Sequence, residues 1–273
     1  MIISNLLELI NAKVINETKL SKVSGFSTNL KTLERANAFF TNSDEDAKKA
    51  AILGAYAIIS SKDLSVVDSD IAYLKVDNLD NAFARLVNFL CSHKEILVVS
   101  KLDLEFLKRL NFSVLDNDLF CDFEKYFKND LLFSQSKLNL IDLNYKNINA
   151  SYQIIKSSSF FYHDLKLNDE FVTNVFIPKI FIPSLAMAHF LKLNINNLKL
   201  LDFVFFNDEN EITKLSEASK VVFFEDNDLI INEMKKHINL IEITKMQNYN
   251  YMLFRGDKQK FLNSLKIEEK GLF

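Results

Sequence analysis

The chain has 273 residues, a formal net charge of −3 at neutral pH and a hydrophobic content of 48%. This length and composition supply a core and exclude a disordered protein, and the charge leaves no basic footprint for nucleic acid. The four glycines of the sequence, Gly25, Gly54, Gly256 and Gly271, lie too far apart to form a phosphate-cradling loop of the Walker A or GxGxxG type.

The cysteines and the N-terminal segment indicate the cellular compartment in which the protein is expected. Cys91 and Cys121 are far apart and belong to no metal-ligand spacing, which favours a reducing cytosol over a disulfide framework. The first segment has an acidic residue in its apolar part and no basic leader. It predicts an amphipathic helix with Leu6, Leu7 and Ile10 on one face, not a signal peptide. No apolar run reaches the ~20 residues that span a bilayer. We expect a soluble cytoplasmic protein without a membrane span.

The first part of the chain alternates short apolar runs with helical patterns, which is typical of parallel α/β units. Asp44–Leu53 predicts a helix that is closed by Gly54. The expected strands here are Ala36–Phe40, Ala55–Ser60, Ile71–Val76 and Glu95–Ser100. The other expected helices are Asn81–Cys91 and Leu102–Leu110.

The middle of the chain has a different pattern. Pro178 and Pro183 argue against a central strand that runs straight through Glu170–Ile182. The expected elements around them are strands over Asn147–Lys156 and Phe160–Leu167 and a helix over Ser184–Leu193. The last part returns to α/β order, with strands over Val221–Phe224, Leu240–Thr244 and Tyr251–Phe254 and helices over Leu229–His237 and Lys258–Leu265.

A polar segment near the start, Ser24–Phe40 (SGFSTNLKTLERANAFF), has residue types in a recognisable order. Gly25, Ser27, Thr28 and Phe39 match the pattern G-x-[ST]-T-D-[ST]-R-x-x-x-x-G-x-L-F. The segment resembles the start of the muramyl (Mur) ligases. These cytoplasmic ATP-dependent enzymes add amino acids to UDP-N-acetylmuramic acid during peptidoglycan synthesis.

The resemblance continues in the same order through Ala50–Ile59, Tyr73–Leu90, Ile148–Asn194 and Ser219–Phe273. The branch it resembles most is the UDP-N-acetylmuramoyl-tripeptide–D-alanyl-D-alanine ligase. The resemblance implies an α/β fold of three lobes. These are a nucleotide-sugar-binding N-terminal lobe over residues 1–95, a truncated central lobe over residues 96–206 and a small Rossmann-like C-terminal lobe over residues 207–273.

The departures from the family pattern concern the activity. After the expected strand EILVVS the ligases enter a TG-x-x-GKT/S loop. This chain continues through Lys101–Glu105 with no glycine and no hydroxyl after a loop lysine to hold Mg²⁺. The family's GRHN sequence is absent at Ile177–Ile182. Because phosphoryl transfer rests on positioning and on the charge of loop and metal, we expect no catalytic residue, no metal and no cofactor.

Ser27, Thr28, Asn29 and Lys31 are the candidate substrate-binding residues. The resemblance places their loop at the uridine diphosphate end of the substrate, and hydroxyls, an amide and a cation suit uracil edges and a pyrophosphate. Asn29, Leu30, Lys31 and Ala36 replace the family's Asp, Ser/Thr, Arg and turn glycine. Lysine keeps the charge of arginine but loses its two-pronged contact. The alternative is a polar turn kept for folding.

Other polar groups are expected to be structural. They are the first-turn acids Asp44–Asp46, the helix-end pair Cys91 and His93, a turn at His163–Asp164, and the turn Arg255–Asp257. Phenylalanines such as Phe203 and Phe223 are expected in core strands.

Three functional hypotheses follow from the sequence. The first is a non-catalytic Mur-ligase-like protein that binds a UDP-N-acetylmuramyl peptide or a cell-wall synthesis protein. The second is an interaction or structural module with no small ligand. The third is a divergent enzyme with relocated chemistry.

Overall fold

The computed structural model describes residues 1–16, 18–195 and 200–270. Contacts within the chain divide it into two compact units. Unit 1 comprises Met1–Val99 and Ser113–Ile148, and unit 2 comprises Ser100–Phe112 and Asn149–Phe273. The expected three-lobe division at residues 95 and 206 rests on the resemblance and stays a prediction.

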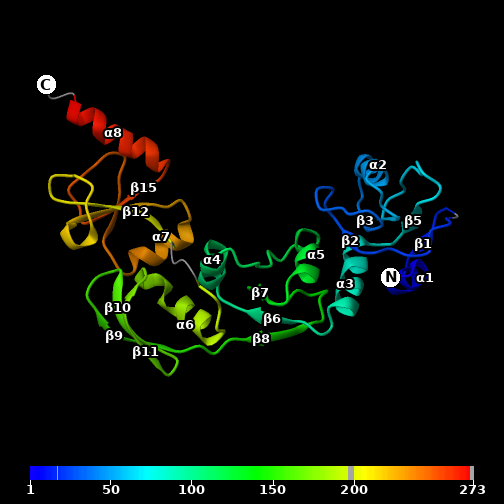
Figure 1. Ribbon diagram of the computed structural model, residues 1–273, viewed down its shortest axis with the longest axis horizontal. Helices are drawn as coiled ribbons and strands as arrows, with labels where there is room; N and C mark the ends of the chain where they lie inside the picture. The colour runs from blue at the N-terminus through cyan, green and yellow to red at the C-terminus, as the bar shows by residue number, and fades with distance from the viewer. Residues whose placement is uncertain (17, 196–199, 271–273) are drawn as a thin grey trace. The chain divides into compact units, whose positions relative to one another are not determined.

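Unit 1 contains a five-stranded sheet with the order β1-β5-β4-β3-β2 (Figure 1). The strands are β1 (Lys13–Val14), β2 (Phe26–Ser27), β3 (Ala38–Phe40), β4 (Ala57–Ser60) and β5 (Ala72–Lys75). The last four run parallel, and β1 is an antiparallel edge. Every residue of β3 and β4 is buried, as expected for parallel strands covered on both faces.

The first three helices accompany this sheet, as the sequence predicted. They are α1 (Ile3–Ile10), α2 (Asp44–Ile52) and α3 (Leu79–Leu90). Leu6 and Ile10 are buried on α1, and Leu7 is half-buried. After α2, Gly54 adopts φ +91°, a conformation that glycine reaches without strain.

A second sheet of unit 1 has the order β7-β6-β8 and is fully parallel. Its strands are β6 (Glu95–Val98), β7 (Leu132–Ser134) and β8 (Asn144–Asn147). The helix α5 (Leu119–Lys128) precedes β7 and begins where the Asp118 side chain accepts a hydrogen bond from the Cys121 N–H. Neither α5 nor β7 was predicted from the sequence.

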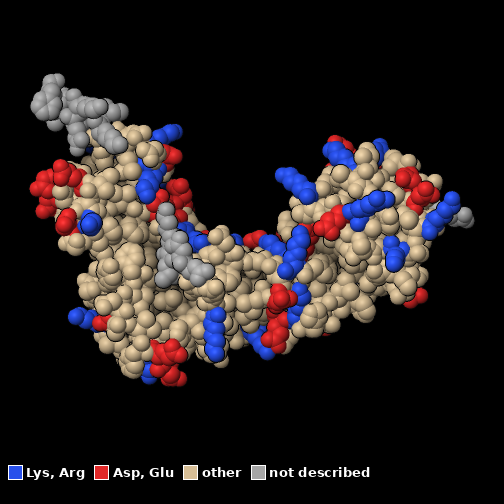
Figure 2. Space-filling view, viewed as in Figure 1, with Lys and Arg blue, Asp and Glu red and all other residues tan. Residues whose placement is uncertain are grey.

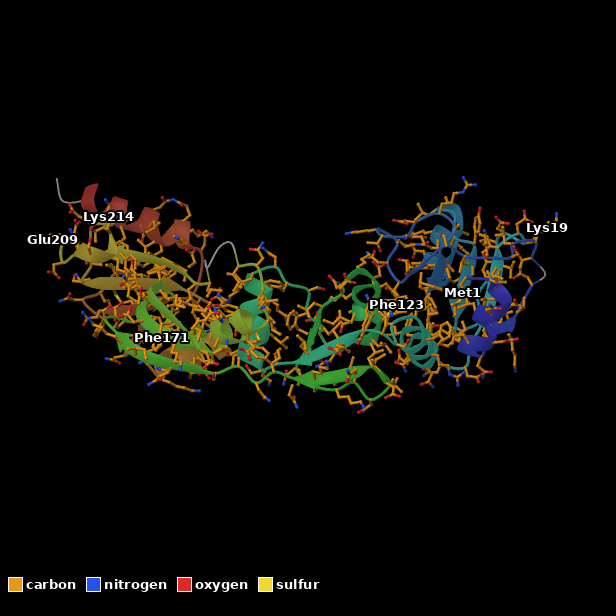
Figure 3. All side chains as sticks on the ribbon, turned by 60° about the horizontal axis from the view of Figure 1, so that its bottom comes forward. Met1, Lys19, Phe123, Phe171, Glu209 and Lys214 are labelled. Carbon is orange, nitrogen blue, oxygen red and sulfur yellow. The ribbon has the colours of Figure 1, made fainter. Side chains whose placement is uncertain are left out.

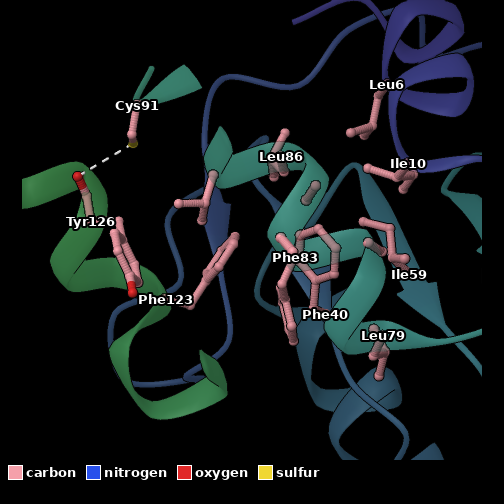
Figure 4. Close-up of a cluster of buried hydrophobic side chains, with 14 of the residues drawn as sticks. Leu6, Ile10, Phe40, Ile59, Leu79, Phe83, Leu86, Cys91, Phe123 and Tyr126 are labelled. Atoms are coloured by element: carbon pink, nitrogen blue, oxygen red, sulfur yellow. Dashed lines mark hydrogen bonds between the residues drawn. The ribbon is translucent and has the colours of Figure 1, made fainter. Parts of the chain in front are cut away.

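One apolar core joins both sheets of unit 1 through α3 and α5, which lie side by side. The rings of Phe40 on β3, Phe83 on α3 and Phe123 on α5 meet at its centre, with centroids 4.6–5.3 Å apart (Figure 4). The far end of α5 is fixed by the buried Lys94, whose Nζ donates to the carbonyl oxygens of Tyr126 (2.8 Å) and Asn129 (2.7 Å). A cation suits the carbonyl end of a helix.

Unit 2 contains an antiparallel sheet with the order β11-β10-β9. Its strands are β9 (Tyr152–Ser157), β10 (Tyr162–Leu167) and β11 (Glu170–Phe176). The strand expected over Asn147–Lys156 is confirmed only from Tyr152, because the chain leaves β8 at Asn147 and pairs again from Tyr152. The prolines act as expected: β11 ends before Pro178, and Pro183 lies in the first turn of α6 (Ile182–Phe190).

The rest of unit 2 is a four-stranded sheet with the order β12-β13-β15-β14. Its strands are β12 (Asp202–Phe206), β13 (Lys220–Phe224), β14 (Leu240–Glu242) and β15 (Tyr251–Phe254), and β12 is the antiparallel member. The helices α7 (Asp228–Lys235) and α8 (Lys258–Lys270) belong to this part of the chain, whereas α4 (Lys101–Arg109) contacts α6. Figure 3 shows Glu209 and Lys214 in the β12–β13 connection and Phe171 on β11.

Two further observations concern the surface charges and the helices. Acidic and basic side chains are interspersed on the face seen in Figure 2, so no large field of one sign is visible there. Within the residues that the structure describes, no helix has both the length and the apolarity needed to cross a membrane.

Candidate functional site

Ser27 is the last residue of β2, the other three candidates lie in the loop that follows, and internal hydrogen bonds fix the shape of this loop. Ser27 is 1% exposed, donates to Glu124 Oε1 over 2.8 Å and accepts from the Asn29 N–H over 3.1 Å. The Asn29 side chain accepts from the Lys31 N–H over 2.9 Å, which is an Asx-type turn. These hydrogen bonds give the polar residues a role in folding the turn, as the alternative hypothesis expects. The Ser27 side chain points into the turn.

Thr28, Asn29 and Lys31 nevertheless border open space. They line one side of a cavity of about 800 Å³, within the size range of small-molecule sites. The opposite side is the exposed face of α5, with Phe120, Cys121, Glu124, Lys125 and Lys128. The structure therefore brings three of the four candidates together on one side of a cavity. The helix α5 on the other side was not predicted from the sequence.

The three lysines of this cavity differ in their partners. Lys125 Nζ lies 2.7 Å from carboxylate oxygens of both Asp116 and Asp122, and it donates to the Val114 carbonyl over 2.9 Å. Lys128 lies 2.6 Å from Glu124 Oε2. Lys31 has no ion pair with any residue that the structure describes. Lys31 is thus the cation that a ligand can reach without first breaking a pair.

The cavity lining contains two acidic residues, Asp46 and Glu124, and internal hydrogen bonds hold Glu124. Its carboxylate accepts from Ser27, Thr32 and Lys128. Partial burial opposes ionisation of Glu124, but the hydrogen bonds from Lys128, Thr32 and Ser27 outweigh it and lower the pKa of the carboxyl. An entering anion would have to compete with Glu124 for Lys128.

The first turn of α4 stands where the resemblance would place a phosphate loop. A helix start attracts phosphate because its first N–H groups lack partners. Here Ser100 Oγ accepts from the Asp103 N–H, and the Asp103 carboxylate accepts from the Ser100 N–H, each over 3.1 Å. The same carboxylate accepts from the buried Ser184 hydroxyl over 2.6 Å. The Asp103 carboxylate therefore occupies the place at the start of α4 where a phosphate would bind. This agrees with the absence of a glycine-rich phosphate loop from the sequence.

The remaining candidates have structural partners. Cys91 ends α3, is buried and lies 3.4 Å from the Tyr126 carbonyl oxygen, and burial raises the pKa of its thiol. Arg255 pairs with Asp228 (2.7 Å) and Glu242 (3.2 Å), and Asp257 accepts from the Lys260 N–H as the cap of α8. The acids of α2 lie in its first turn, as predicted.

The turn expected at His163–Asp164 is wrong, since both residues lie within β10. His163 is 2% exposed, its Nδ1 is 2.6 Å from Ser157 Oγ, and its Nε2 faces two backbone carbonyls. Burial lowers its pKa, so the neutral imidazole is favoured. No group of three or more His, Cys, Asp or Glu side chains within the described residues could hold a metal ion.

Comparisons with known proteins give a likeness in fold. No family model and no curated protein matches the sequence. The solved UDP-N-acetylmuramoylalanyl-D-glutamyl-2,6-diaminopimelate–D-alanyl-D-alanyl ligase from Acinetobacter baumannii is similar, with a TM-score of 0.50, 9% identity and 97% coverage of both chains. The chain thus has the mixed α/β fold of this ligase, as expected.

Two other matches are weaker. For MurF from Acinetobacter baumannii (crystal structure I), the TM-score is 0.35 at 12% identity, over 53% of this chain and 35% of that one. The chain therefore spans about a third of the length of that protein. For the MurF ligase from Thermotoga maritima in complex with ADP, the TM-score is 0.45 at 8% identity, over 78% and 74% of the two chains.

Proposed function

We propose that the protein is a non-catalytic relative of the Mur ligases that binds a UDP-N-acetylmuramyl peptide in the cavity of unit 1. The main support for this proposal is the position of Lys31. This residue borders the cavity beside Thr28 and Asn29, and it has no ion pair among the described residues. A diphosphate suits Lys31, and the hydroxyl and amide suit the uracil and ribose. Such precursors are cytoplasmic, so the protein would act in the cytoplasm.

The start of α4 supports the non-catalytic part of the proposal. Asp103 repels a triphosphate at the position where a ligase would hold it, and the chain lacks the glycines of a phosphate loop. The protein would bind the precursor or present it to a cell-wall enzyme, and would not extend it.

The open cavity also favours this proposal over an interaction module without a small ligand. Such a module would fill the space between the loop and α5 with its own side chains. A cavity of about 800 Å³ remains there instead. For relocated chemistry, His163 offers no accessible base, because it is buried in β10 and faces backbone carbonyls.

Calorimetry with a UDP-N-acetylmuramyl tripeptide tests the binding. We expect one bound ligand per chain and an affinity that falls with salt, because Lys31 and Lys128 are accessible to counterions. The absence of both heat and a thermal shift at millimolar ligand would remove the proposal. UDP alone and the free muramyl peptide serve as separate ligands and show which end is recognised.

A phosphate-release assay tests the non-catalytic part separately. It contains ATP, Mg²⁺, the tripeptide precursor and D-alanyl-D-alanine, and we expect no release above the rate without protein. Release that depends on the precursor would show an active ligase and would leave the binding site itself intact.

A further inference from the structure

Unit 2 has a second cavity, of about 490 Å³, at the amino ends of its parallel strands. Val221 near the start of β13 pairs with Tyr251, the first residue of β15, and Asn239 directly precedes β14. All three residues line the cavity, and Ser159 and Phe161 from the β9–β10 turn form another part of its wall.

This position differs from the usual one in α/β sheets, where ligands bind at the carboxyl ends of the strands. At the carboxyl end of β15, Arg255 is already paired with Asp228 and Glu242. None of the residues that line the amino-end cavity belongs to that edge.

The lining of the cavity is uncharged. Aromatic rings come from Phe161, Tyr249 and Tyr251, and hydrogen-bonding side chains come from Ser159, Ser219, Asn239 and Asn250. None of the lining residues carries a charge at neutral pH. A phosphate or carboxylate would lose its water there without gaining a cation, so an uncharged ligand is favoured.

Polar groups in this lining lack partners. Ser219 Oγ is buried and has no hydrogen-bond partner among the described residues. The Asn239 side chain likewise has no hydrogen bond within the part of the chain that the structure describes. Asn250 Nδ2 donates to the Ser219 carbonyl over 3.0 Å, which fixes that side chain. Ser219 Oγ is shielded from the cavity, so the exposed Asn239 amide is the group that a ligand with a polar edge can reach.

Tyr249 is 45% exposed and borders the cavity next to Asn250. A half-exposed aromatic ring beside free amide and hydroxyl groups suits a flat ring with a polar edge. Stacking on aromatic rings and hydrogen bonding to the edge are how proteins hold single nucleobases.

We propose that this cavity binds the base of a nucleoside, an uncharged planar heterocycle. The aromatic rings would contact its faces, and the Asn239 amide would pair with its edge. The 5′ substituent must remain outside, since the lining offers no cation for a phosphate.

Saturation-transfer NMR with adenosine or uridine and the full chain tests this site. We expect transfer to the base protons, with roughly tenfold weaker binding in Asn239→Ala and Tyr249→Ala, as for the loss of one hydrogen bond or one stacking contact. Tyr152→Ala is the matched control, because Tyr152 lies in the same unit, is 47% exposed and does not line the cavity.

Three results would overturn the proposal. One is no transfer to either nucleoside at millimolar concentration, and another is binding that Asn239→Ala and Tyr249→Ala leave unchanged. The third is transfer to N-acetylglucosamine alone, which would show a sugar site instead of a base site. Asn239→Asp provides a second variant of nearly equal size, so that a folding defect in Asn239→Ala cannot explain a loss.

Discussion

The loop after β2 and the first turn of α4 both contain hydroxyl groups and backbone N–H groups, and they differ in the carboxylate that satisfies these groups. At α4 the carboxylate that satisfies the turn is Asp103, three residues along the same helix. At the loop it is Glu124, which belongs to another element and also holds Lys128. Asp103 lies within its own helix turn and so fills the place of an external anion. Glu124 comes from a facing helix and leaves Lys31 of the loop accessible to a ligand.

The largest expected effect tests whether α5 supports the cavity. Phe123→Ala should lower the free energy of unfolding by about 3–5 kcal/mol, because a fully buried ring is lost from the core shared with Phe40 and Phe83. Urea unfolding measures it. Phe89→Ala is the control, since Phe89 lies on α3 but is 62% exposed. Equal destabilisation by both variants would contradict the packing described for α5.

The next effect concerns Asp103, the carboxylate that caps α4. Asp103→Ala should cost about 2 kcal/mol of stability, because Ser100 loses its capping partner and the buried Ser184 hydroxyl loses its acceptor. Asp80→Ala, in the first turn of α3, is the control and should change stability little. We expect no ADP binding by Asp103→Ala in calorimetry, and binding would show that the carboxylate alone closes a preserved nucleotide site.

A change in affinity without a change in stability is expected at Lys31. Lys31→Ala should weaken the UDP-muramyl ligand about tenfold, whereas Lys31→Arg should strengthen binding through a two-pronged contact with the diphosphate. Calorimetry measures both variants, with exposed Lys13→Ala as the control. If the arginine variant bound no better than alanine, the diphosphate would not lie at this residue.

The smallest effect concerns the pH dependence of the loop. The folded pKa of Glu124 lies below its ordinary value of 4.5, so the carboxylate contributes stability above that pH and loses it as pH falls through the folded pKa. Glu124→Gln should reduce the loss of stability on acidification, as measured by thermal unfolding between neutral and acidic pH. Glu8→Gln, an exposed change on α1, is the control. An unchanged acid profile in Glu124→Gln would show that the hydrogen bonds around Glu124 are not maintained in solution.

Much of the fold was predictable because most elements have strong local signals. The apolar runs that became β4, β6 and β15 are short, continuous and bounded by polar residues. The helix α5 also had such signals, since Asp118 is a capping residue and Phe123 and Tyr126 share one helical face. The sequence therefore contains local signals for α5, although this segment has no counterpart in the resemblance.

The composition of the cavity could not be predicted in the same way. The residue types of Thr28, Asn29 and Lys31 suggested a binding loop, but nothing local shows that Glu124 lies 2.8 Å from Ser27. That contact joins segments far apart in the sequence and depends on how α5 packs on β3 and α3. The amino-end cavity of unit 2 depends in the same way on a turn between β9 and β10 that lies against distant strands.

Ala36 is a strained position of unit 1 whose strain can be relieved. It stands where the resemblance places a turn glycine, and it adopts φ +68°, where a side chain costs about 1–2 kcal/mol. Because glycine reaches this conformation without that cost, Ala36→Gly is expected to raise the free energy of unfolding and to give a more stable sample for crystallisation.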